Sequence, residues 1–278
     1  MKLKSGAKIN IGLKVLNRRS DGYHNILTVF QELNFGDDLE VVKSDNGCEF
    51  SSNVSWLKND KSNLCVSAWI KMRDSFSKLR GVKIRLKKRI PKGSGLGGGS
   101  SNAAGVIKCL NSIFSLNMTH KKMENVAADL GADVAFFIQG GTQIGKGIGE
   151  DLKTLSSPPS GTVLLVFPNI HINTAQAFGL LKNKLEDINE SPNFASFFQE
   201  NSFPEEIFKN DFEKVIFPAY PEIGRIKKTL IELGAVFAGL SGSGSTVYGI
   251  FNDVSSAVSA ESQFKSTYHT IVTSPANS

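Results

Sequence analysis

The stretch PKGSGLGGGSSNAAG, residues 91–105, places five glycines within seven positions and then two serines. Before it, Val82, Ile84 and Leu86 alternate with charged residues, which predicts a half-exposed strand. After it, apolar residues recur at helical spacing from Ala103 to Phe114, which predicts an amphipathic helix. A Gly/Ser linker usually separates domains. A short loop between two well-patterned elements is therefore better explained as an ordered loop that holds a ligand.

A dinucleotide-binding loop is one alternative, because Gly93, Gly95 and Gly98 fit the pattern G-x-G-x-x-G. The preceding strand argues against it, since a central parallel strand is apolar on both faces. An acidic residue for the ribose is also expected about 20 residues further on, yet neither Asp nor Glu occurs from Pro91 to Met123. No G-K-[ST] ends the loop, so a P-loop does not fit either.

A phosphate cradle of another kind explains the loop better. Glycines adopt positive φ and let the backbone approach an anion closely, and a helix N-terminus favours negative charge. Ser100 and Ser101 are expected to cap the helix and to offer hydroxyls to phosphate or to phosphate-bound Mg²⁺. Lys88 and Lys92 would add positive charge.

Composition limits the other classes of function. The chain has 278 residues, is 40% hydrophobic and 21% charged, and carries a net charge of +6 with a pI near 9.1. Such a basic chain suits a polyanionic small molecule or a nucleic acid. The three cysteines and four histidines lack metal-site or disulfide-framework spacing. The N-terminus has no apolar signal region, so we expect a cytoplasmic protein without membrane or metal sites.

The Pro/Ser-rich stretch SSPPSG, residues 156–161, is the best domain boundary and predicts domains at 1–157 and 158–278. In the first, alternation over residues 7–15 predicts a strand with one apolar face. The turn RSDGYH, the strand NILTVFQEL, and then a turn and a strand at NFGDDLEVV should follow. A helix from about residue 62, capped by Ser62 or Asn63, precedes the strand that leads to the loop.

The second domain begins with a buried strand at GTVLLVF and a helix at NTAQAFGLLKNK, residues 173–184. A further helix should start at Pro221 and end at Gly234. The stretch AVFAGLSGSGSTVYGIF predicts two strands joined by a Gly/Ser turn, followed by a helix and a last strand. Antiparallel pairs with helices on one face predict an α+β fold.

At this point the sequence resembles the GHMP kinases, a family that includes galactokinase, homoserine kinase and mevalonate kinase. The glycine-rich stretch looks like the central motif of that family. Four more stretches match in the family's order: SGAKINIGL, RSDGYHNILTVFQELNFGD, LGADVAFFIQGG and GLSGSGSTVYGIF. The match is closest to members that phosphorylate the 2-hydroxyl of 4-diphosphocytidyl-2-C-methyl-D-erythritol in the non-mevalonate isoprenoid pathway.

The resemblance implies an N-terminal, ATP-binding domain similar to the second domain of ribosomal protein S5. It also implies a ferredoxin-like, substrate-binding C-terminal domain, with the active site between the two. The implied partners are ATP with Mg²⁺ and the cytidine diphosphate methylerythritol. The predicted ATP-binding residues are Pro91, Lys92, Gly93, Ser94, Gly95, Leu96, Gly97, Gly98, Gly99, Ser100 and Ser101, with Lys88 beside the loop and Asn63 and Leu64 at the adenine.

On the pattern alone, Asp133 would be a helix N-cap and Lys8 a solvent-exposed strand lysine. The resemblance instead makes both residues catalytic, with Asp133 as the base and Lys8 beside it to stabilise charge on the transferring phosphoryl group.

The predicted substrate-binding residues are Asn10, Tyr23, His24 and Phe178, of which GYH in the family helps to hold the cytosine. Phe178 would be the opposing aromatic ring, although its helix position also suits a core residue. Asn210, Asp211 and Glu213 match the family's N-D-x-E stretch, to which we assign no role at this stage.

Three departures from the family pattern are Gly6 in place of proline, Gly179 in place of a lysine found in some members, and SGSGST in the last motif. Two other hypotheses remain open. One is another small-molecule GHMP kinase, such as a homoserine kinase, against which the RSDGYH turn argues. The other is a non-catalytic RNA-binding protein, which the basic pI and the ribosomal-type domain suggest and which predicts salt-dependent binding.

Overall fold

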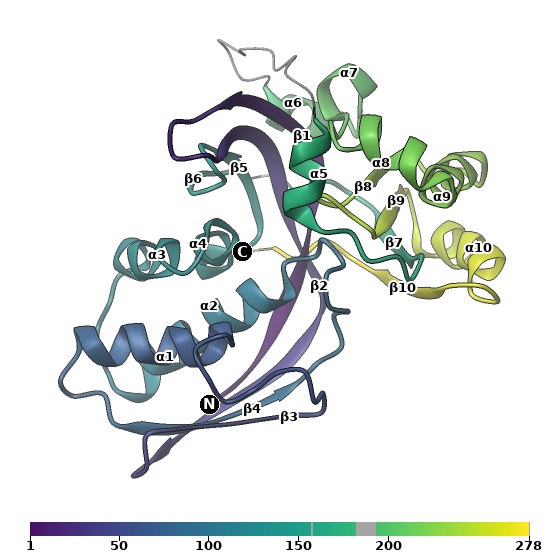
Figure 1. Cartoon of the computed structure of the whole chain (residues 1–278). Helices are drawn as coiled ribbons and strands as arrows, with labels where there is room; N and C mark the ends of the chain where they lie inside the picture. The colour runs from purple at the N-terminus through teal and green to yellow at the C-terminus, as the bar shows by residue number, and fades with distance from the viewer. Residues whose placement is uncertain (157, 182–192, 278) are drawn as a thin grey trace. The chain divides into compact units, whose positions relative to one another are not determined.

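The computed structural model describes residues 1–156, 158–181 and 193–277 and has the expected α+β architecture (Figure 1). The strands are β1 (Lys2–Arg18), β2 (His24–Ser44), β3 (Cys48–Ser52), β4 (Gly81–Lys87), β5 (Thr142–Lys146), β6 (Asp151–Thr154), β7 (Thr162–Phe167), β8 (Phe237–Leu240), β9 (Val247–Phe251) and β10 (His269–Thr273). The helices are α1 (Leu64–Ser75), α2 (Gly98–Ile113), α3 (His120–Ala128), α4 (Ala132–Gln139), α5 (Thr174–Leu180), α6 (Phe194–Gln199), α7 (Glu205–Phe208), α8 (Glu213–Ala219), α9 (Pro221–Glu232) and α10 (Val254–Phe264).

The chain divides into two compact units that are not continuous in sequence. Unit 1 comprises Met1–Ala7, Gly36–Pro91 and Gly97–Gly140, and unit 2 comprises the remaining stretches Lys8–Phe35, Lys92–Leu96 and Gly141–Ser278. Strands β1 and β2 each contribute residues to both units. The sequence-based domain boundary, whose residue 157 lies outside the described residues, stays a prediction, as do residues 182–184 of the helix expected after Asn173.

In unit 1, helices α1 and α2 lie on one side of a sheet formed by β3, β4 and the second half of β2 (Figure 1). Strand β4 has the predicted alternation: Val82, Ile84 and Leu86 are buried while the charged residues between them are exposed. It pairs antiparallel with β2 but parallel with β3. The parallel pair of β3 and β4 adds to the expected antiparallel pairs, because α1 carries the chain across between these two strands.

Strand β2 differs from the sequence prediction. The expected turn at NFGDD is absent, and His24–Ser44 is one continuous strand of 21 residues. Gly36 lies in this strand because a Cβ there would come within 2.2 Å of the Ser5 carbonyl oxygen. This glycine allows the backbones of β1 and β2 to approach closely rather than making a turn.

Strand β1 also differs from the sequence prediction. Its alternating residues predicted one polar, exposed face, but Lys8 is only 4% exposed and Asn10 only 1%. Both faces of the strand are buried from Ser5 to Leu13. A buried ammonium is costly unless it has partners, so the position of Lys8 itself indicates a role beyond solubility.

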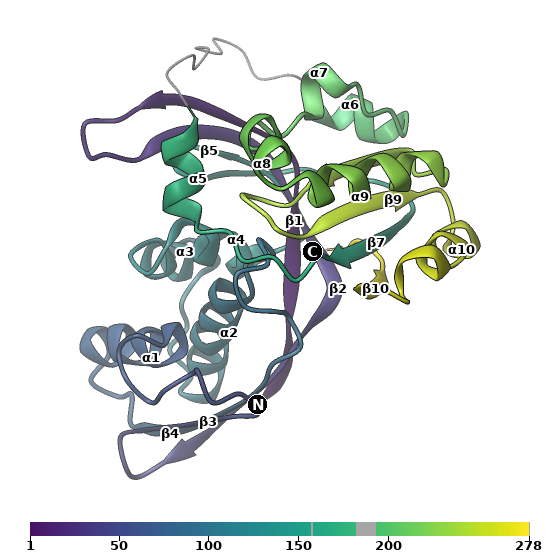
Figure 2. The same cartoon turned by 45° about the vertical axis from the view of Figure 1, so that its right-hand side comes forward.

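Unit 2 contains a four-stranded antiparallel sheet in the order β10-β7-β9-β8. Along the chain, helices separate β7 from β8, and α10 separates β9 from β10. This is the β-α-β-β-α-β arrangement of a ferredoxin-like fold, which confirms the prediction. Figure 2 shows α9 and α10 beside this sheet.

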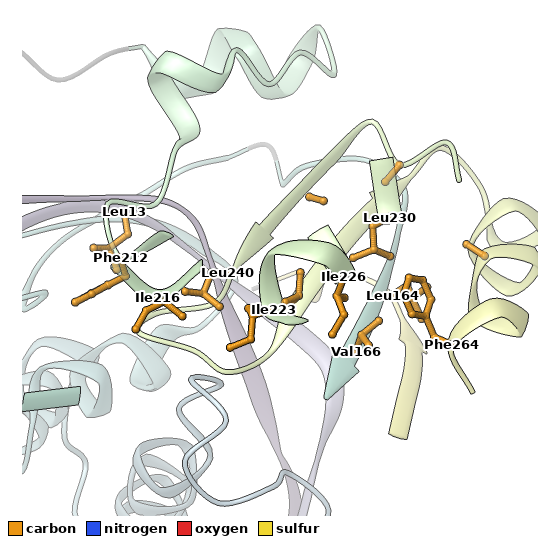
Figure 3. Close-up of a cluster of buried hydrophobic side chains, with 14 of the residues drawn as sticks. Leu13, Leu164, Val166, Phe212, Ile216, Ile223, Ile226, Leu230, Leu240 and Phe264 are labelled. Atoms are coloured by element: carbon orange, nitrogen blue, oxygen red, sulfur yellow. The ribbon is translucent and has the colours of Figure 1, made fainter. Parts of the chain in front are cut away.

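The core of unit 2 lies between that sheet and its helices (Figure 3). Leu164 and Val166 of β7 pack with Ile226 and Leu230 of α9 and with Phe264 of α10. Each such side chain contributes about 1.5–3 kcal/mol on burial. Helix α9 begins at Pro221 and is followed at Gly234 by a residue with φ +92°, as predicted.

Candidate active site

The glycine-rich loop has one defined conformation. Gly93, Gly95 and Gly97 have φ values of +66°, +79° and +67°, a region that other residues adopt only at a cost. Every second residue from 93 to 97 thus requires glycine for its backbone. The loop is a shaped structure and not a flexible linker.

In unit 2, loop residues 92–96 lie against the Gly/Ser turn that follows β8. A Cβ on Gly95 would come within 2.1 Å of the Ser241 carbonyl oxygen. The Ser241 hydroxyl donates to the Gly95 carbonyl at 3.1 Å, and the Thr246 amide donates to the Ser94 carbonyl at 3.3 Å. Two motifs about 150 residues apart in the chain therefore form one contiguous backbone surface.

Lys8 and Asn10 lie in a buried hydrogen-bonded chain. The Lys8 ammonium donates to Asn10 Oδ1 at 2.6 Å, Asn10 Nδ2 donates to Thr28 Oγ1 at 2.9 Å, and Thr28 Oγ1 donates to the Gly12 carbonyl at 2.6 Å. Because Asn10 Nδ2 donates to Thr28, Asn10 Oδ1 is the atom that faces Lys8, and these hydrogen bonds fix the orientation of the Asn10 amide. Thr28 is a supporting residue that the sequence analysis did not identify.

Gly242 marks where these parts of unit 2 meet. A Cβ on it would lie 3.7 Å from Lys8 Nζ, 3.6 Å from Asn10 Oδ1 and 3.5 Å from the Gly95 carbonyl oxygen. The Lys8 amide also donates to the Leu96 carbonyl at 3.0 Å. The loop, the Gly/Ser turn and β1 thus converge on one ammonium group, an arrangement suited to an anionic ligand.

The N-D-x-E stretch, which had no role in the sequence analysis, supports this convergence. Asn210 is buried, and its Nδ2 donates to the carbonyls of Leu240 and Gly242 at 2.8 Å each. Its Oδ1 accepts the Phe212 amide at 3.0 Å. Asn210 therefore holds the start of the Gly/Ser turn, and the N-D-x-E stretch that resembles the family was the signal for it.

Asp211 and Glu213 extend this support in two directions. Asp211 accepts the Val15 amide of β1 at 2.8 Å. Glu213 accepts the Leu240 amide at 3.0 Å and forms an ion pair with Lys227 at 2.7 Å. Burial raises the pKa of Glu213, although the Lys227 ammonium opposes that shift. The stretch therefore links the strand that carries Lys8 to the turn that faces it.

Tyr248 ties β9 to the same strand. Its hydroxyl donates to the Asn10 carbonyl at 2.7 Å, and its side chain is fully buried. Burial raises the pKa of the Tyr248 phenol well above its usual value. The phenol stays protonated and keeps this hydrogen bond.

An aromatic pair forms another part of unit 2. The rings of His24 and Phe178 stack with centroids 5.1 Å apart and planes 9° apart, and Phe178 packs edge-on against Phe212 at 4.9 Å. Tyr23, next to His24, is 62% exposed. Burial lowers the pKa of His24, and the Arg18 guanidinium lowers it further. The His24 ring is therefore neutral near pH 7.

In unit 1, the N-terminus of α2 differs from the expected cap. Gly97, in the left-handed conformation, is the N-cap residue, and no side chain of the described residues caps the helix there. Ser100 and Ser101 lie inside the first turn, so the prediction that they cap it is wrong. The first amide to bond within the helix is that of Ser101, to the Gly97 carbonyl at 2.9 Å. The amides before it point out of the helix end, where they favour an anion.

Asn63 and Leu64 lie near that helix end. Asn63 is the N-cap of α1, as predicted, and its Oδ1 accepts the Cys65 amide at 3.0 Å. A Cβ on Gly99 would lie 3.7 Å from Leu64 Cδ1. The residues predicted for the adenine therefore adjoin the glycine-rich helix start.

Asp133 lies in the first turn of α4 and is half-buried. Gly131 is the N-cap residue of this helix, so the pattern-based reading of Asp133 as the cap is wrong. An acidic side chain in a first turn interacts favourably with the helix dipole, which stabilises the helix.

Comparison with known proteins decides the family. The GHMP kinases N terminal domain matches residues 63–141, and the GHMP kinases C terminal domain matches residues 181–270. The chain belongs to the GHMP kinase family. It is 36% identical over 279 aligned residues to the 4-diphosphocytidyl-2-C-methyl-D-erythritol kinase of Chlorobium chlorochromatii, covering 98% of this chain and 96% of the relative. It is 37% identical to the enzyme of the same name from Caldanaerobacter subterraneus, covering 96% and 94%.

Solved structures agree with this kinase fold. A crystal structure of 4-(cytidine 5'-diphospho)-2C-methyl-D-erythritol kinase has a TM-score of 0.87 at 28% identity and is covered completely, as is this chain. A homoserine kinase from Cytophaga hutchinsonii has a TM-score of 0.75 at 18% identity, with 98% of this chain and 96% of that chain covered. The second likeness concerns the fold alone.

The predicted site residues fall into two sets, one in each of the two units. Unit 2 holds Lys8, Asn10, Tyr23, the loop residues 92–96 and the His24–Phe178 pair. Unit 1 holds the other predicted residues, namely Asn63, Leu64, Lys88, Pro91, Gly97, Gly98, Gly99, Ser100, Ser101 and Asp133. The pairing of Lys8 with Asp133 stays a prediction, as do the individual binding roles.

Within residues 1–156, 158–181 and 193–277, no three His, Cys, Asp or Glu side chains are grouped so that they could hold a metal ion. None of the helices there is both long and apolar enough to cross a membrane.

Proposed function

We propose that this kinase transfers the terminal phosphoryl group of ATP to the 2-hydroxyl of 4-diphosphocytidyl-2-C-methyl-D-erythritol. The products would be ADP and the 2-phosphate of that substrate, with the hydroxyl proton released. The names of the relatives at 36% and 37% identity over nearly the whole chain support this substrate.

The observation that carries the proposal is the aromatic pair of His24 and Phe178, stacked at 5.1 Å beside the exposed Tyr23. Flat aromatic surfaces with a polar edge suit a pyrimidine base, which stacks on rings and hydrogen-bonds through its edge. Homoserine and mevalonate carry no nucleobase, so a kinase that phosphorylates them needs no such surface for its acceptor substrate. The pair thus favours the cytidine-linked substrate over those of other GHMP kinases.

The glycine-rich loop fits the phosphates of ATP. It combines positive-φ glycines with an α2 N-terminus that lacks a side-chain cap and has no acidic residue in its first turn. Backbone amides of residues 97–100 would hold phosphate oxygens there. Mg²⁺ would arrive with the ATP and neutralise charge on the transferring group.

Lys8 and Asp133 would act on the transfer itself. Lys8, held by Asn10 and buried, would stabilise negative charge on the phosphoryl group in flight. Asp133 would accept or orient the hydroxyl proton of the substrate. Removing either group should lower kcat by roughly 10²–10³-fold.

The test supplies Mg·ATP with 4-diphosphocytidyl-2-C-methyl-D-erythritol, homoserine or mevalonate in parallel and follows ADP release. We expect turnover only with the cytidine-linked alcohol. Asp133→Asn and Lys8→Ala should lose activity, whereas Asp129→Asn, an exposed acid in an ion pair with Lys71, should keep it. Absence of turnover by the wild type with the cytidine-linked alcohol would refute the proposal.

We also propose a cytoplasmic location, which the three unpaired cysteines Cys48, Cys65 and Cys109 support. Fractionation with a marker for each compartment tests it. The assignment of residues 1–157 to ATP binding and 158–278 to substrate binding remains our proposal. Limited proteolysis with and without each ligand would test it, because each ligand should protect its own part.

A further inference from the structure

We propose that Asp37 is a positioning residue that fixes both ends of the glycine-rich loop and thereby sets the affinity of the kinase for ATP. The proposal rests on the ATP-binding role given to the loop above. Asp37 is the last residue of the motif RSDGYHNILTVFQELNFGD, but no binding or catalytic role was predicted for it.

The Asp37 carboxylate is fully buried and accepts hydrogen bonds from four donors. Its Oδ1 accepts the backbone amides of Arg89 at 2.6 Å and Ile90 at 2.9 Å. Its Oδ2 accepts Asn102 Nδ2 at 2.9 Å and the Lys88 ammonium. Charge-assisted hydrogen bonds of this kind are stronger than neutral ones, so the cluster is a rigid point in unit 1.

Along the chain, these donors lie directly before and directly after the glycine-rich loop. Lys88, Arg89 and Ile90 immediately precede Pro91, where the loop begins, and Asn102 immediately follows Ser101, where it ends. Both ends of an eleven-residue segment are therefore bonded to one carboxylate. Fixing the ends lowers the number of conformations the loop can adopt before a ligand binds, which lowers the entropic cost of binding.

Lys88 was predicted to contact ATP because it lies beside the loop in the sequence, but in the structure its ammonium pairs with Asp37. Its side chain is 6% exposed, it pairs with Asp37, and its ammonium also donates to Asn102 Oδ1 at 3.2 Å. A Cβ on Gly98 would lie 3.1 Å from the Lys88 ammonium. Lys88 is thus the counter-ion inside the cluster, and its charge is compensated by Asp37.

The test compares Asp37→Asn with Asp38→Asn. The first variant keeps the side-chain shape but removes the charge and one acceptor oxygen. The second removes the neighbouring carboxylate, which is 45% exposed and pairs with Arg89. We expect Asp37→Asn to raise the KM for ATP and the Kd for a fluorescent ATP analogue by at least ~10-fold, a change of about 1.4 kcal/mol. The KM for the alcohol substrate should stay within about twofold, and Asp38→Asn should resemble the wild type in all three.

A second variant covers the case in which Asp37→Asn does not fold. Asn102→Ala keeps the Asp37–Lys88 ion pair and the two backbone bonds, and it removes the Asn102 bonds to Asp37 and Lys88 that hold the helix end of the loop. It should raise the Kd for the ATP analogue about threefold or more with circular dichroism unchanged. Equal ATP affinity in Asn102→Ala and wild type, or equal rises in the KM values for both substrates, would overturn the proposal. Because analogue binding needs no turnover, the outcome is separate from the identity of the alcohol.

Discussion

The imidazole of His24 lies flat against the phenyl ring of Phe178, with the ring centroids 5.1 Å apart and the planes within 9°. The two residues are separated by more than 150 positions, and one begins β2 while the other lies in α5. Their contact makes a polar-edged aromatic surface, which under the function proposed above would hold the cytosine of the substrate.

Phe178→Ala should weaken binding of the cytidine-linked substrate. An aromatic pair contributes about 0.5–1.5 kcal/mol beyond its area, so the KM for that substrate should rise about 3- to 10-fold. The KM for ATP should not change. Steady-state kinetics with each substrate varied in turn checks this, with Phe178→Tyr as the variant that keeps the ring. An equal loss of affinity for both substrates would indicate a folding defect instead.

His24 should titrate below its ordinary pKa of 6.5, because burial and Arg18 both favour the neutral ring. The unfolded chain then binds more protons in that range, so stability should fall as the pH drops from 6.5 through the depressed pKa. NMR titration of the imidazole measures the midpoint. Phe178→Ala exposes the ring and should move the midpoint upward toward 6.5, and a midpoint already above 6.5 in the wild type would contradict this account.

Gly95→Ala should disrupt the loop through a steric clash. A Cβ there would meet the Ser241 carbonyl at 2.1 Å and the Gly244 carbonyl at 3.0 Å. We expect kcat/KM to fall at least ~100-fold, since a displacement of about 1 Å in a catalytic site can have that effect. Gly234→Ala is the matched control, because its φ is +92° but nothing lies within 4 Å of its Cβ. It should lose about 1 kcal/mol of stability and keep its activity; similar activity in the two variants would argue against the close approach.

Asn210→Ala should loosen the Gly/Ser turn. It leaves the buried carbonyls of Leu240 and Gly242 without their donor, which costs about 1–3 kcal/mol and lowers Tm by about 3–10 °C. Because Gly242 adjoins Lys8 and Asn10, kcat should fall as well. Asp211→Asn keeps an oxygen that can accept the Val15 amide and loses only an exposed pair with Lys214, so it should remain near wild type in scanning calorimetry and in turnover.

Helices and strands were predicted correctly where a single local feature, such as alternation or a capping residue, determines them. The alternation in β4, the proline and glycine around α9, and the Asn63 cap were all confirmed. The glycine at position 36 was interpreted as a turn because a sequence does not display the Ser5 backbone packed against it. The burial of Lys8 was missed for the same reason, since alternation assigns a face but not what covers that face.

The site divides along the same line. The family was predictable from its motifs, and the ordered glycine-rich loop from its place between two patterned elements, while the binding roles of the aromatic residues stay predictions. The supporting residues Asp37, Thr28 and Asn210 were not predictable, because each acts on backbone groups or side chains that come close only after folding. All three lay in stretches that resemble the family, Thr28 and Asp37 in RSDGYHNILTVFQELNFGD and Asn210 in N-D-x-E, but the motifs alone gave them no role.

The hydrogen bond from Tyr248 to the Asn10 carbonyl has a consequence for protein synthesis. Its two ends are 238 residues apart, so the buried strand that carries Lys8 is completed only when nearly the whole chain has been made. Unit 1 ends at Gly140 and can be complete much earlier, since domains generally fold as units during translation. The nascent chain must therefore shield the apolar residues of β1 beyond Ala7 for seconds, at ~5–20 residues per second, and this interval is where chaperones would be needed most.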